Sequence, residues 1–128
     1  MKNICLCVQN QLLREAIELE LKRSGNFRIH EEPIERYNEV VGDCIKDEAE
    51  ILFMEIMFGQ NTGVDGWLRV CKLVREQLPG CKLVFLVDEN SMPSEAYRVM
   101  TAKQMGLIDM FFYSSVTATY LAAVLEAL

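Results

Sequence analysis

The sequence has one histidine, three prolines and no pair of cysteines separated by two residues. Histidine is the side chain most often used for general acid–base catalysis, and closely spaced Cys/His pairs are the usual signature of a zinc site. His30 has no second titratable group at motif spacing. We therefore predict that the chain is not an enzyme and holds no structural metal.

Positive charge is also scarce, because 13 Lys and Arg residues stand against 19 Asp and Glu residues, for a net charge of −6. A nucleic-acid surface or a polybasic membrane anchor requires clustered basic residues, so we expect no direct contact with either. No apolar run reaches the about 18 residues of a membrane span, and no secretory signal follows Met1. We therefore expect a soluble, cytoplasmic domain.

The five cysteines form an odd set without disulfide or zinc spacing. Cys5 and Cys7 are two residues apart and share one face of a predicted strand. Cys44 and Cys71 lie in apolar helical patterns, where a free thiol behaves as a small hydrophobic group. We predict buried, unpaired thiols.

Apolar runs alternate with helically spaced segments along the whole chain. The runs predict strands at 3–8, 27–31, 50–57, 82–87 and 110–113. Helices are predicted at 11–24, at 33–45, at 67–78, in a segment capped by Ser91 or Ser94 and ending at 105, and in a last segment capped by Ser115 or Thr117. The residues from 59 to 66 are predicted to form a loop.

These alternating elements predict a parallel sheet, because the connections are crossovers rather than hairpins. The predicted fold class is α/β: a (βα)5 three-layer sandwich with a parallel five-stranded sheet in the order 2-1-3-4-5, formed by one domain over residues 1–128. In such a sheet the functional crevice lies at the carboxyl ends of the strands. Glycine-rich phosphate motifs are missing from the segments expected there.

Two stretches resemble the receiver domain of response regulators, the phosphoacceptor module of two-component signalling. They are NICLCVQNQLLREAIELEL at 3–21 and ILFMEIMFGQNTGVDGWLRVCKLVRE at 51–76. KLVFLV at 82–87 and GLIDMFFYSS at 106–115 are similar to the fourth and fifth strand regions of that family in pattern. The resemblance covers nearly the whole chain and implies the flavodoxin-like fold.

The resemblance also implies that the positions of the phosphorylation chemistry are substituted. Glu55 stands at the phosphoacceptor, Gln9 and Asn10 at the acidic pair for Mg²⁺, Val87 at the hydroxyl, Tyr113 and Ser114 at the Lys-Pro pair, and Met110 at the switch aromatic. Mg²⁺ prefers carboxylate and phosphate oxygens, so we expect its binding to be weak or absent, and we expect no other cofactor. The chain is interpreted as a degenerate "pseudo-receiver".

Glu55 has two interpretations. It is either a built-in mimic of a phosphorylated residue or a strand-end carboxylate paired with the Tyr113 hydroxyl or with backbone N–H groups. Gln9 and Asn10 are interpreted as a turn and a helix cap rather than as ligands. Trp67 is interpreted as a core residue or an interface anchor.

In the receiver family, helix 4, strand 5 and helix 5 form the face used for dimerisation and output. The corresponding residue types here favour a homodimer or a protein partner, and a packed sheet edge is the alternative. The candidates are Tyr97, Met100, Met105, Phe111, Tyr113 and Tyr120.

The resemblance therefore predicts a signalling or protein-interaction module that acts without phosphorylation. We expect it to be the regulatory part of a bacterial transcription regulator, with a DNA-binding output domain outside this chain. One alternative is a working phosphoacceptor that uses Glu55 or Asp65. Another is a small-molecule sensor that uses the degenerate pocket.

Overall fold

A parallel sheet forms the central layer of the fold. The computed structural model describes residues 1–59 and 61–128; Gln60, within the predicted loop, lies outside these ranges. Five parallel strands are described, in the order β2-β1-β3-β4-β5, which confirms the predicted fold class and strand order. They are β1 (Lys2–Cys7), β2 (Phe27–Glu31), β3 (Ile51–Glu55), β4 (Lys82–Val87) and β5 (Met110–Tyr113).

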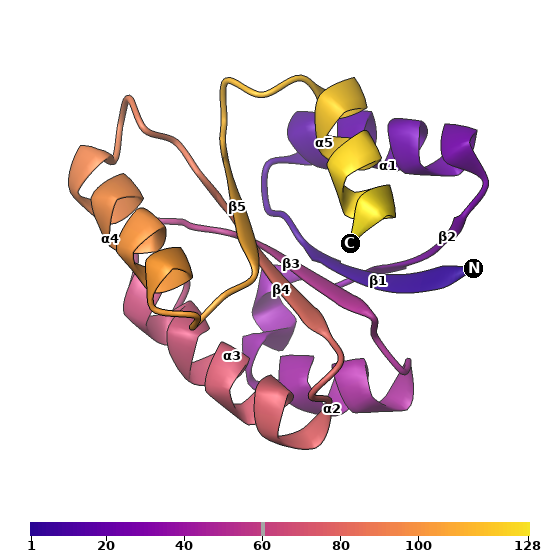
Figure 1. Ribbon diagram of the computed structural model, residues 1–128, viewed down its shortest axis with the longest axis horizontal. Helices are drawn as coiled ribbons and strands as arrows, with labels where there is room; N and C mark the ends of the chain where they lie inside the picture. Colours follow the sequence, from indigo (N-terminus) through magenta and orange to yellow (C-terminus); the bar gives the residue numbers. More distant parts are fainter. Residues whose placement is uncertain (60) are drawn as a thin grey trace.

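Helices cover both faces of the sheet (Figure 1). Helices α1 and α5 pack on one face, and α2, α3 and α4 pack on the other. The elements are α1 (Gln11–Ser24), the 3₁₀ helix η1 (Ile34–Glu39), α2 (Val40–Lys46), α3 (Val64–Gln77), α4 (Pro93–Gln104) and α5 (Ala118–Ala127). None of the helices in the described ranges has the length and apolar character needed to cross a bilayer.

Side-chain alternation divides each apolar strand between two cores. In β1, Ile4 and Leu6 belong to the core beneath α1 and α5, whereas Cys5 and Cys7 belong to the core beneath α2, α3 and α4. All four side chains are buried. A strand covered on both faces needs no polar alternation, which explains the nearly continuous apolar runs of the sequence.

Capping residues set the start of two helices. The Asn10 Oδ1 atom accepts a hydrogen bond from the Leu13 N–H at 3.0 Å, and the Thr117 Oγ1 atom accepts one from the Tyr120 N–H at 3.1 Å. Both side chains were predicted as caps. The prediction for α4 was wrong: this helix begins at Pro93 and no side chain caps it. Proline at the first helical position has a suitable φ and lacks the N–H that a cap would satisfy.

The predicted second helix is wrong in its first half. Pro33 is extended, with φ −62° and ψ 147°, and residues 34–39 form a 3₁₀ helix before α2 begins. The Tyr37 ring packs edge-on against Trp67 with 5.3 Å between ring centroids. The Tyr37 hydroxyl donates a hydrogen bond to the Gly66 carbonyl oxygen at 2.7 Å. These tertiary contacts coincide with the tighter helix, and helical periodicity in the sequence does not reveal them.

The β3–α3 connection also differs from its prediction. Strand β3 ends at Glu55 rather than at Met57, and α3 begins at Val64, three residues before the predicted start at Trp67. Gly66 therefore lies in the first turn of α3, where the chain passes close to Asn61. A Cβ atom on Gly66 would lie 2.0 Å from the Asn61 carbonyl oxygen. This close approach requires glycine.

We predict that Gly66→Ala destabilises the domain by about 1–3 kcal/mol, because the added methyl group overlaps backbone atoms that must shift. Gly42→Ala is the matched control, since a Cβ atom there meets nothing within 4 Å in the middle of α2. The control is expected to stabilise the domain by up to about 1 kcal/mol through helix propensity. Urea unfolding of the three proteins measures both effects. Equal stability of Gly66→Ala and wild type would contradict the close approach.

Candidate functional site

Glu55 lies at the carboxyl end of the central strand and bonds to the backbone before α1. Its Oε1 atom accepts hydrogen bonds from the Gln9 N–H at 2.9 Å and from the Asn10 N–H at 3.2 Å. Backbone donors at the start of a helix favour a negative charge, because the helix itself leaves them unpaired. The carboxylate therefore joins the end of β3 to the start of α1. Its partners are backbone N–H groups, one of the two possibilities that the sequence left open.

Gln9 and Asn10, which the resemblance places at the acidic pair, present N–H donors to Glu55. Asn10 uses its backbone N–H for Glu55 and its side-chain oxygen to cap α1. The Gln9 side chain is exposed, and only its backbone N–H contacts the carboxylate. Sequence analysis anticipated the cap, but not that both backbone N–H groups would converge on one carboxylate oxygen.

Trp67 fixes the backbone of Glu55 from the opposite side. The Trp67 Nε1–H donates a hydrogen bond to the Glu55 carbonyl oxygen at 3.2 Å, and the indole is 1% exposed. A buried indole N–H needs an acceptor, so this bond satisfies the ring while holding the strand end. Trp67 is therefore a core residue that also positions the candidate site.

Of the residues that the resemblance places at switch positions, Val87 and Met110 are apolar and Tyr113 carries a neutral hydroxyl. Val87 is buried and apolar, and its carbonyl oxygen accepts a hydrogen bond from the Ser114 N–H at 3.0 Å. Tyr113 is partly exposed, and its ring packs edge-on against Phe111 at 5.3 Å. Met110 is half-buried in β5. Within the described ranges, no hydrogen bond joins the Tyr113 hydroxyl to Glu55, the other possibility that the sequence left open.

The residues at this edge do not fit Mg²⁺. The cation requires several hard oxygen ligands, commonly one or two carboxylates with phosphate oxygens and water. Here Glu55 Oε1 already accepts two N–H bonds, and the neighbouring Gln9 and Asn10 side chains are neutral amides. Over residues 1–59 and 61–128, no group of three His, Cys, Asp or Glu side chains could hold a metal ion.

A cleft of about 620 Å³ opens beside the edge, between the β3–α3 connection and α4. Two arginines and two carboxylates line it together with apolar side chains. The Arg98 guanidinium pairs with Asp65 and lies 3.5 Å from the Glu95 carboxylate. Glu95 also accepts a hydrogen bond from the Val64 N–H at 3.3 Å. Asp65, the alternative phosphoacceptor, is thus engaged in an ion pair.

Charged side chains connect α3 to α4 and to the loop after it. In the middle of α4, Arg98 pairs with Asp65 of α3. Beyond the end of α4, the Arg75 guanidinium donates hydrogen bonds to the Gly106 carbonyl oxygen and the Asp109 carboxylate, both at 2.7 Å. Asp109 in turn accepts a bond from the Leu83 N–H at 2.8 Å. Sequence reasoning missed these pairs, because charges 33 and 34 residues apart show no local pattern.

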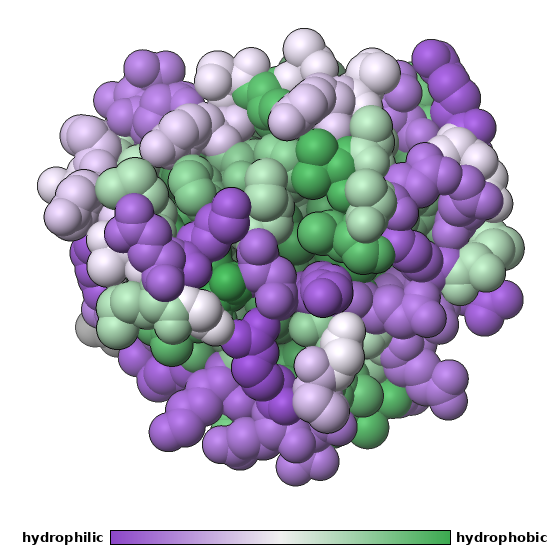
Figure 2. All heavy atoms as spheres, viewed as in Figure 1, coloured by the Kyte–Doolittle hydropathy of each residue, from purple (hydrophilic) through white to green (hydrophobic). Residues whose placement is uncertain are grey.

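The face formed by α4, β5 and α5 carries the interface candidates. Tyr97 and Tyr120 are 67% and 58% exposed, and Met100 and Phe111 are half-buried. Figure 2 shows hydrophobic residues gathered over α5 and beside β5, with hydrophilic residues around them. The Lys103 ammonium lies 5.9 Å from the centre of the Phe111 ring. This face combines aromatic anchors with a polar rim, as protein interfaces do.

All five cysteines are buried in the core beneath α2, α3 and α4. Burial is the main cause that raises the pKa of Cys71 and of Cys81 to about 12. The pKa of Cys7 is raised chiefly by burial, and that of Cys44 chiefly by its hydrogen bond with the Cys5 thiol. These observations confirm the prediction of buried, unpaired thiols.

The sequence matches no protein-family model and no curated protein. Solved structures do match. One is described as belonging to a family of redox sensors in the streptococci that evolved from two-component response regulators. It has a TM-score of 0.73 and 14% identity, and the match covers 99% of this chain and 50% of that one. The chain therefore spans about half the length of that protein.

Two further matches are shorter proteins. The receiver domain of AraT, a response regulator from Geobacillus stearothermophilus, has a TM-score of 0.68 and 20% identity over 98% of this chain and 91% of its own. The chemotaxis protein CheY4 of Vibrio cholerae has a TM-score of 0.69 and 16% identity over 100% and 99%. This protein has the receiver fold. The likeness establishes its architecture, and the function must be argued from its own residues.

We predict that Glu55→Ala costs about 1–3 kcal/mol of folding free energy, because two backbone donors lose their acceptor. Glu55→Gln is expected to cost less, about 1 kcal/mol, since the amide oxygen still accepts but carries no charge. Chemical denaturation of the two variants measures the difference. If both variants match the wild type, the carboxylate does not hold the β1–α1 turn.

We predict that no thiol of the folded domain reacts within minutes with a thiol-specific disulfide reagent at neutral pH, because the thiolate is the reactive species. The same reagent is expected to modify all five cysteines in denaturant. Absorbance of the released chromophore gives the count in each state. Rapid modification of one or more cysteines in the native domain would contradict the burial described above.

Proposed function

We propose that this chain is a receiver-like signalling module that works without phosphorylation. The supporting observation is the contact of the Glu55 carboxylate with the Gln9 and Asn10 N–H groups. A phosphoacceptor must present its carboxylate to the phosphoryl donor beside a cation, whereas the Oε1 atom of Glu55 accepts both N–H bonds. Here the carboxylate serves as an internal connection between β3 and α1.

The side chains at positions 87 and 113 also argue against phosphoryl transfer, because neither is basic. Phosphoryl transfer proceeds through positioning and through neutralisation of charge on the transferred group, commonly by Mg²⁺ and a basic side chain. Tyr113 occupies the position that resembles the lysine, and Val87 the position that resembles the hydroxyl. Neither supplies a positive charge, so the usual phosphorelay chemistry has no support at this edge.

The ion pairs between α3 and α4 favour a surface held in one state. Arg98 connects the middle of α4 to α3, and Arg75 connects α3 to the loop after α4, in the unmodified chain. We infer that α4, β5 and α5 form a permanent protein-binding face used for a symmetric homodimer, the commonest oligomer. We further infer a cytoplasmic transcription regulator in which this domain controls an attached DNA-binding output domain. The streptococcal neighbour, twice as long as the match, is consistent with such an attachment.

Three other functions receive less support. Phosphorylation of Asp65 would have to break its ion pair with Arg98. Sensing of an apolar small molecule fits poorly with a cleft lined by two arginines and two carboxylates. The redox activity of the streptococcal neighbour would require a reactive thiol, and the cysteines of this chain are buried.

We predict a dimer at about 100 µM protein, burying at least about 1,000 Å² in total. A Tyr97→Ala, Tyr120→Ala double variant is expected to be monomeric, because both rings project from the proposed face. Sedimentation velocity measures the populations, and Mg²⁺ with beryllofluoride, a phosphoryl mimic, is expected to leave them unchanged.

Leu12→Ala, Leu19→Ala is the matched control, since these side chains are 80% and 59% exposed on α1, on the other side of the sheet from α4. It should remain dimeric. A monomeric wild type, or loss of the dimer only in the α1 variant, would overturn the proposed face. A dimer that forms only with beryllofluoride would overturn phosphorylation independence.

A further inference from the structure

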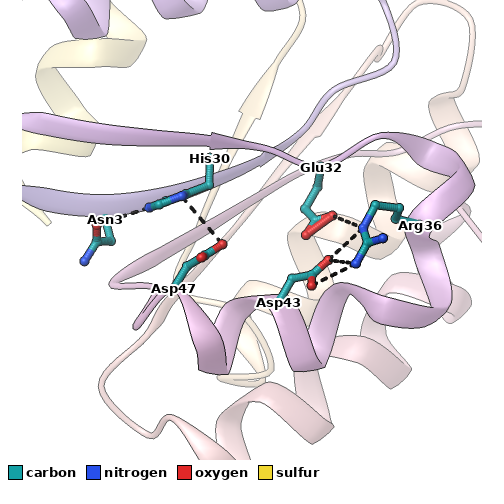
Figure 3. A network of polar contacts seen from close by, with 6 residues as sticks. All are labelled: Asn3, His30, Glu32, Arg36, Asp43 and Asp47. Atoms are coloured by element: carbon teal, nitrogen blue, oxygen red, sulfur yellow. Dashed lines mark hydrogen bonds and ion pairs between the residues drawn. The ribbon is translucent and has the colours of Figure 1, made fainter.

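The last residue of β2 and the one after it carry carboxylates that meet partners on opposite faces of the sheet. Glu31 meets Glu18 of α1, and Glu32 meets Asp43 of α2. The Glu32 side chain is only 5% exposed. Figure 3 shows Glu32 and Asp43 directed toward each other, with Arg36 of η1 beside both. Two carboxyl groups and one guanidinium therefore fill the junction between the edge strand and α2.

Arg36 is committed mainly to Asp43. Its Nε and Nη2 atoms donate to the two Asp43 carboxylate oxygens, both at 3.0 Å. Glu32 Oε2 lies 3.8 Å from Arg36 Nε, beyond hydrogen-bond distance. This oxygen is buried and has no hydrogen-bond partner among the described residues. A charged Glu32 would be incompletely compensated, whereas a protonated Glu32 can donate to Asp43.

Apart from Arg36, no basic side chain among the described residues that act on the Glu32 carboxyl group compensates its negative charge. Asp47, which follows α2, adds negative charge near Glu32. The Cys7 thiol of β1 also lies near the Glu32 carboxyl group. Asp47 itself faces His30 of β2, with 3.6 Å between Oδ2 and Nδ1. Lys46 acts on Asp43, and Glu39 acts on Arg36.

These contacts raise the pKa of Glu32 from 4.5 to about 8, first through burial and then through the hydrogen bond and charge of Asp43. The pKa of Asp43 lies below its ordinary value, first because Glu32 donates a hydrogen bond to it and also because Arg36 pairs with it. One proton is thus shared within the pair and is held more firmly than by an ordinary glutamate.

The segment that this pair holds is not a regular helix. Pro33 is extended, Arg36 departs from helical geometry with φ −96° and ψ 19°, and α2 has only seven residues. A short helix depends on its tertiary contacts rather than on its own hydrogen bonds. On one side of the segment, Tyr37 contacts α3; on the other, the contact between Glu32, Arg36 and Asp43 joins it to β2.

We propose that residues 33–46 form a proton-controlled latch on the edge of the sheet. With a proton shared between Glu32 and Asp43, this pair fastens the segment to the end of β2, and Arg36 holds Asp43 in place. Without that proton, two carboxylates face one another in a buried junction with one guanidinium, and the segment opens more often. The inference is independent of the proposed function and concerns a different edge of the domain.

The direction of the pH dependence follows from linkage. The pKa of Glu32 is higher in the closed segment than in the open one, so opening releases a proton. The stabilisation is complete below the ordinary pKa of 4.5, declines as the pH rises, and is lost once the pH passes about 8. One proton allows at most about a tenfold change in the opening constant for each pH unit.

Amide hydrogen exchange followed by mass spectrometry tests the latch between about pH 5 and about pH 9, after correction for intrinsic exchange rates. In the wild type, the opening constant for peptides covering residues 34–46 is expected to rise at least about tenfold from about pH 6 to about pH 8 and then level off. In the Glu32→Gln variant, the opening constant is expected to stay low and independent of pH, because the Gln amide donates a hydrogen bond to Asp43 and does not titrate.

Two variants separate this effect from general pH effects. Glu18→Gln removes the other buried carboxyl pair, in which burial, followed by contact with Glu31, raises the pKa of Glu18 to about 7. Lys22 and Arg14 of α1 oppose that rise. The variant should leave the slope at residues 34–46 unchanged. Glu76→Gln, on the exposed surface of α3, should also behave as wild type.

The Asp43→Asn variant tests the same carboxyl pair from its other member. It removes the facing charge, so we expect Glu32 to titrate closer to its ordinary range and the slope between pH 6 and 8 to shrink. A flat wild-type profile at residues 34–46 would overturn the latch, as would an unchanged slope in Glu32→Gln. Equal slopes in every peptide of the wild type would also overturn it, because they would indicate global unfolding.

Discussion

The bond between the Glu55 carboxylate and the backbone before α1 is the contact on which the carboxyl edge of the sheet depends. A single oxygen accepts two N–H groups, while Trp67 holds the carbonyl oxygen of the same residue from the opposite core. β3, α1 and α3 therefore meet at one residue. Glu55, which the resemblance places at the phosphoacceptor position, therefore forms a structural junction between these elements.

Helix α3, which contacts Glu55 through Trp67, also contacts α4 and the loop after α4. Its first turn contacts Arg98 of α4, and its last turn contacts the loop after α4 through Arg75. Side-chain contacts thus connect β3, α3 and α4. Its other edge, at β2 and α2, has a short helix, a 3₁₀ helix and buried carboxyl groups. We infer that any remaining responsiveness of the fold is concentrated there.

The sequence predicted the architecture because apolar runs and helical periodicity are local signals. The five strands, their order, the caps at Asn10 and Thr117 and the burial of the cysteines followed from residues near one another in the chain. The 3₁₀ helix and the early start of α3 depend on Tyr37, Trp67 and Gly66, which meet only after folding. The sequence left two kinds of partner open for the Glu55 carboxylate, the Tyr113 hydroxyl and backbone N–H groups. Only the folded structure shows that the partners are the N–H groups of Gln9 and Asn10. The Glu32–Asp43 pair and the ion pairs of α3 join residues that are far apart in the chain, so no local sequence pattern indicates them.

Phosphoryl transfer to the intact protein tests the central claim most directly. The domain is incubated with Mg²⁺ and a small phosphoryl donor such as acetyl phosphate, and its mass is then measured without denaturing acid or heat that would hydrolyse an acyl phosphate. The account predicts an unchanged mass, because Glu55 Oε1 is bonded to the backbone at residues 9 and 10 and the Val87 and Tyr113 side chains supply no positive charge. A phosphoryl adduct located on Glu55 or Asp65 would contradict it.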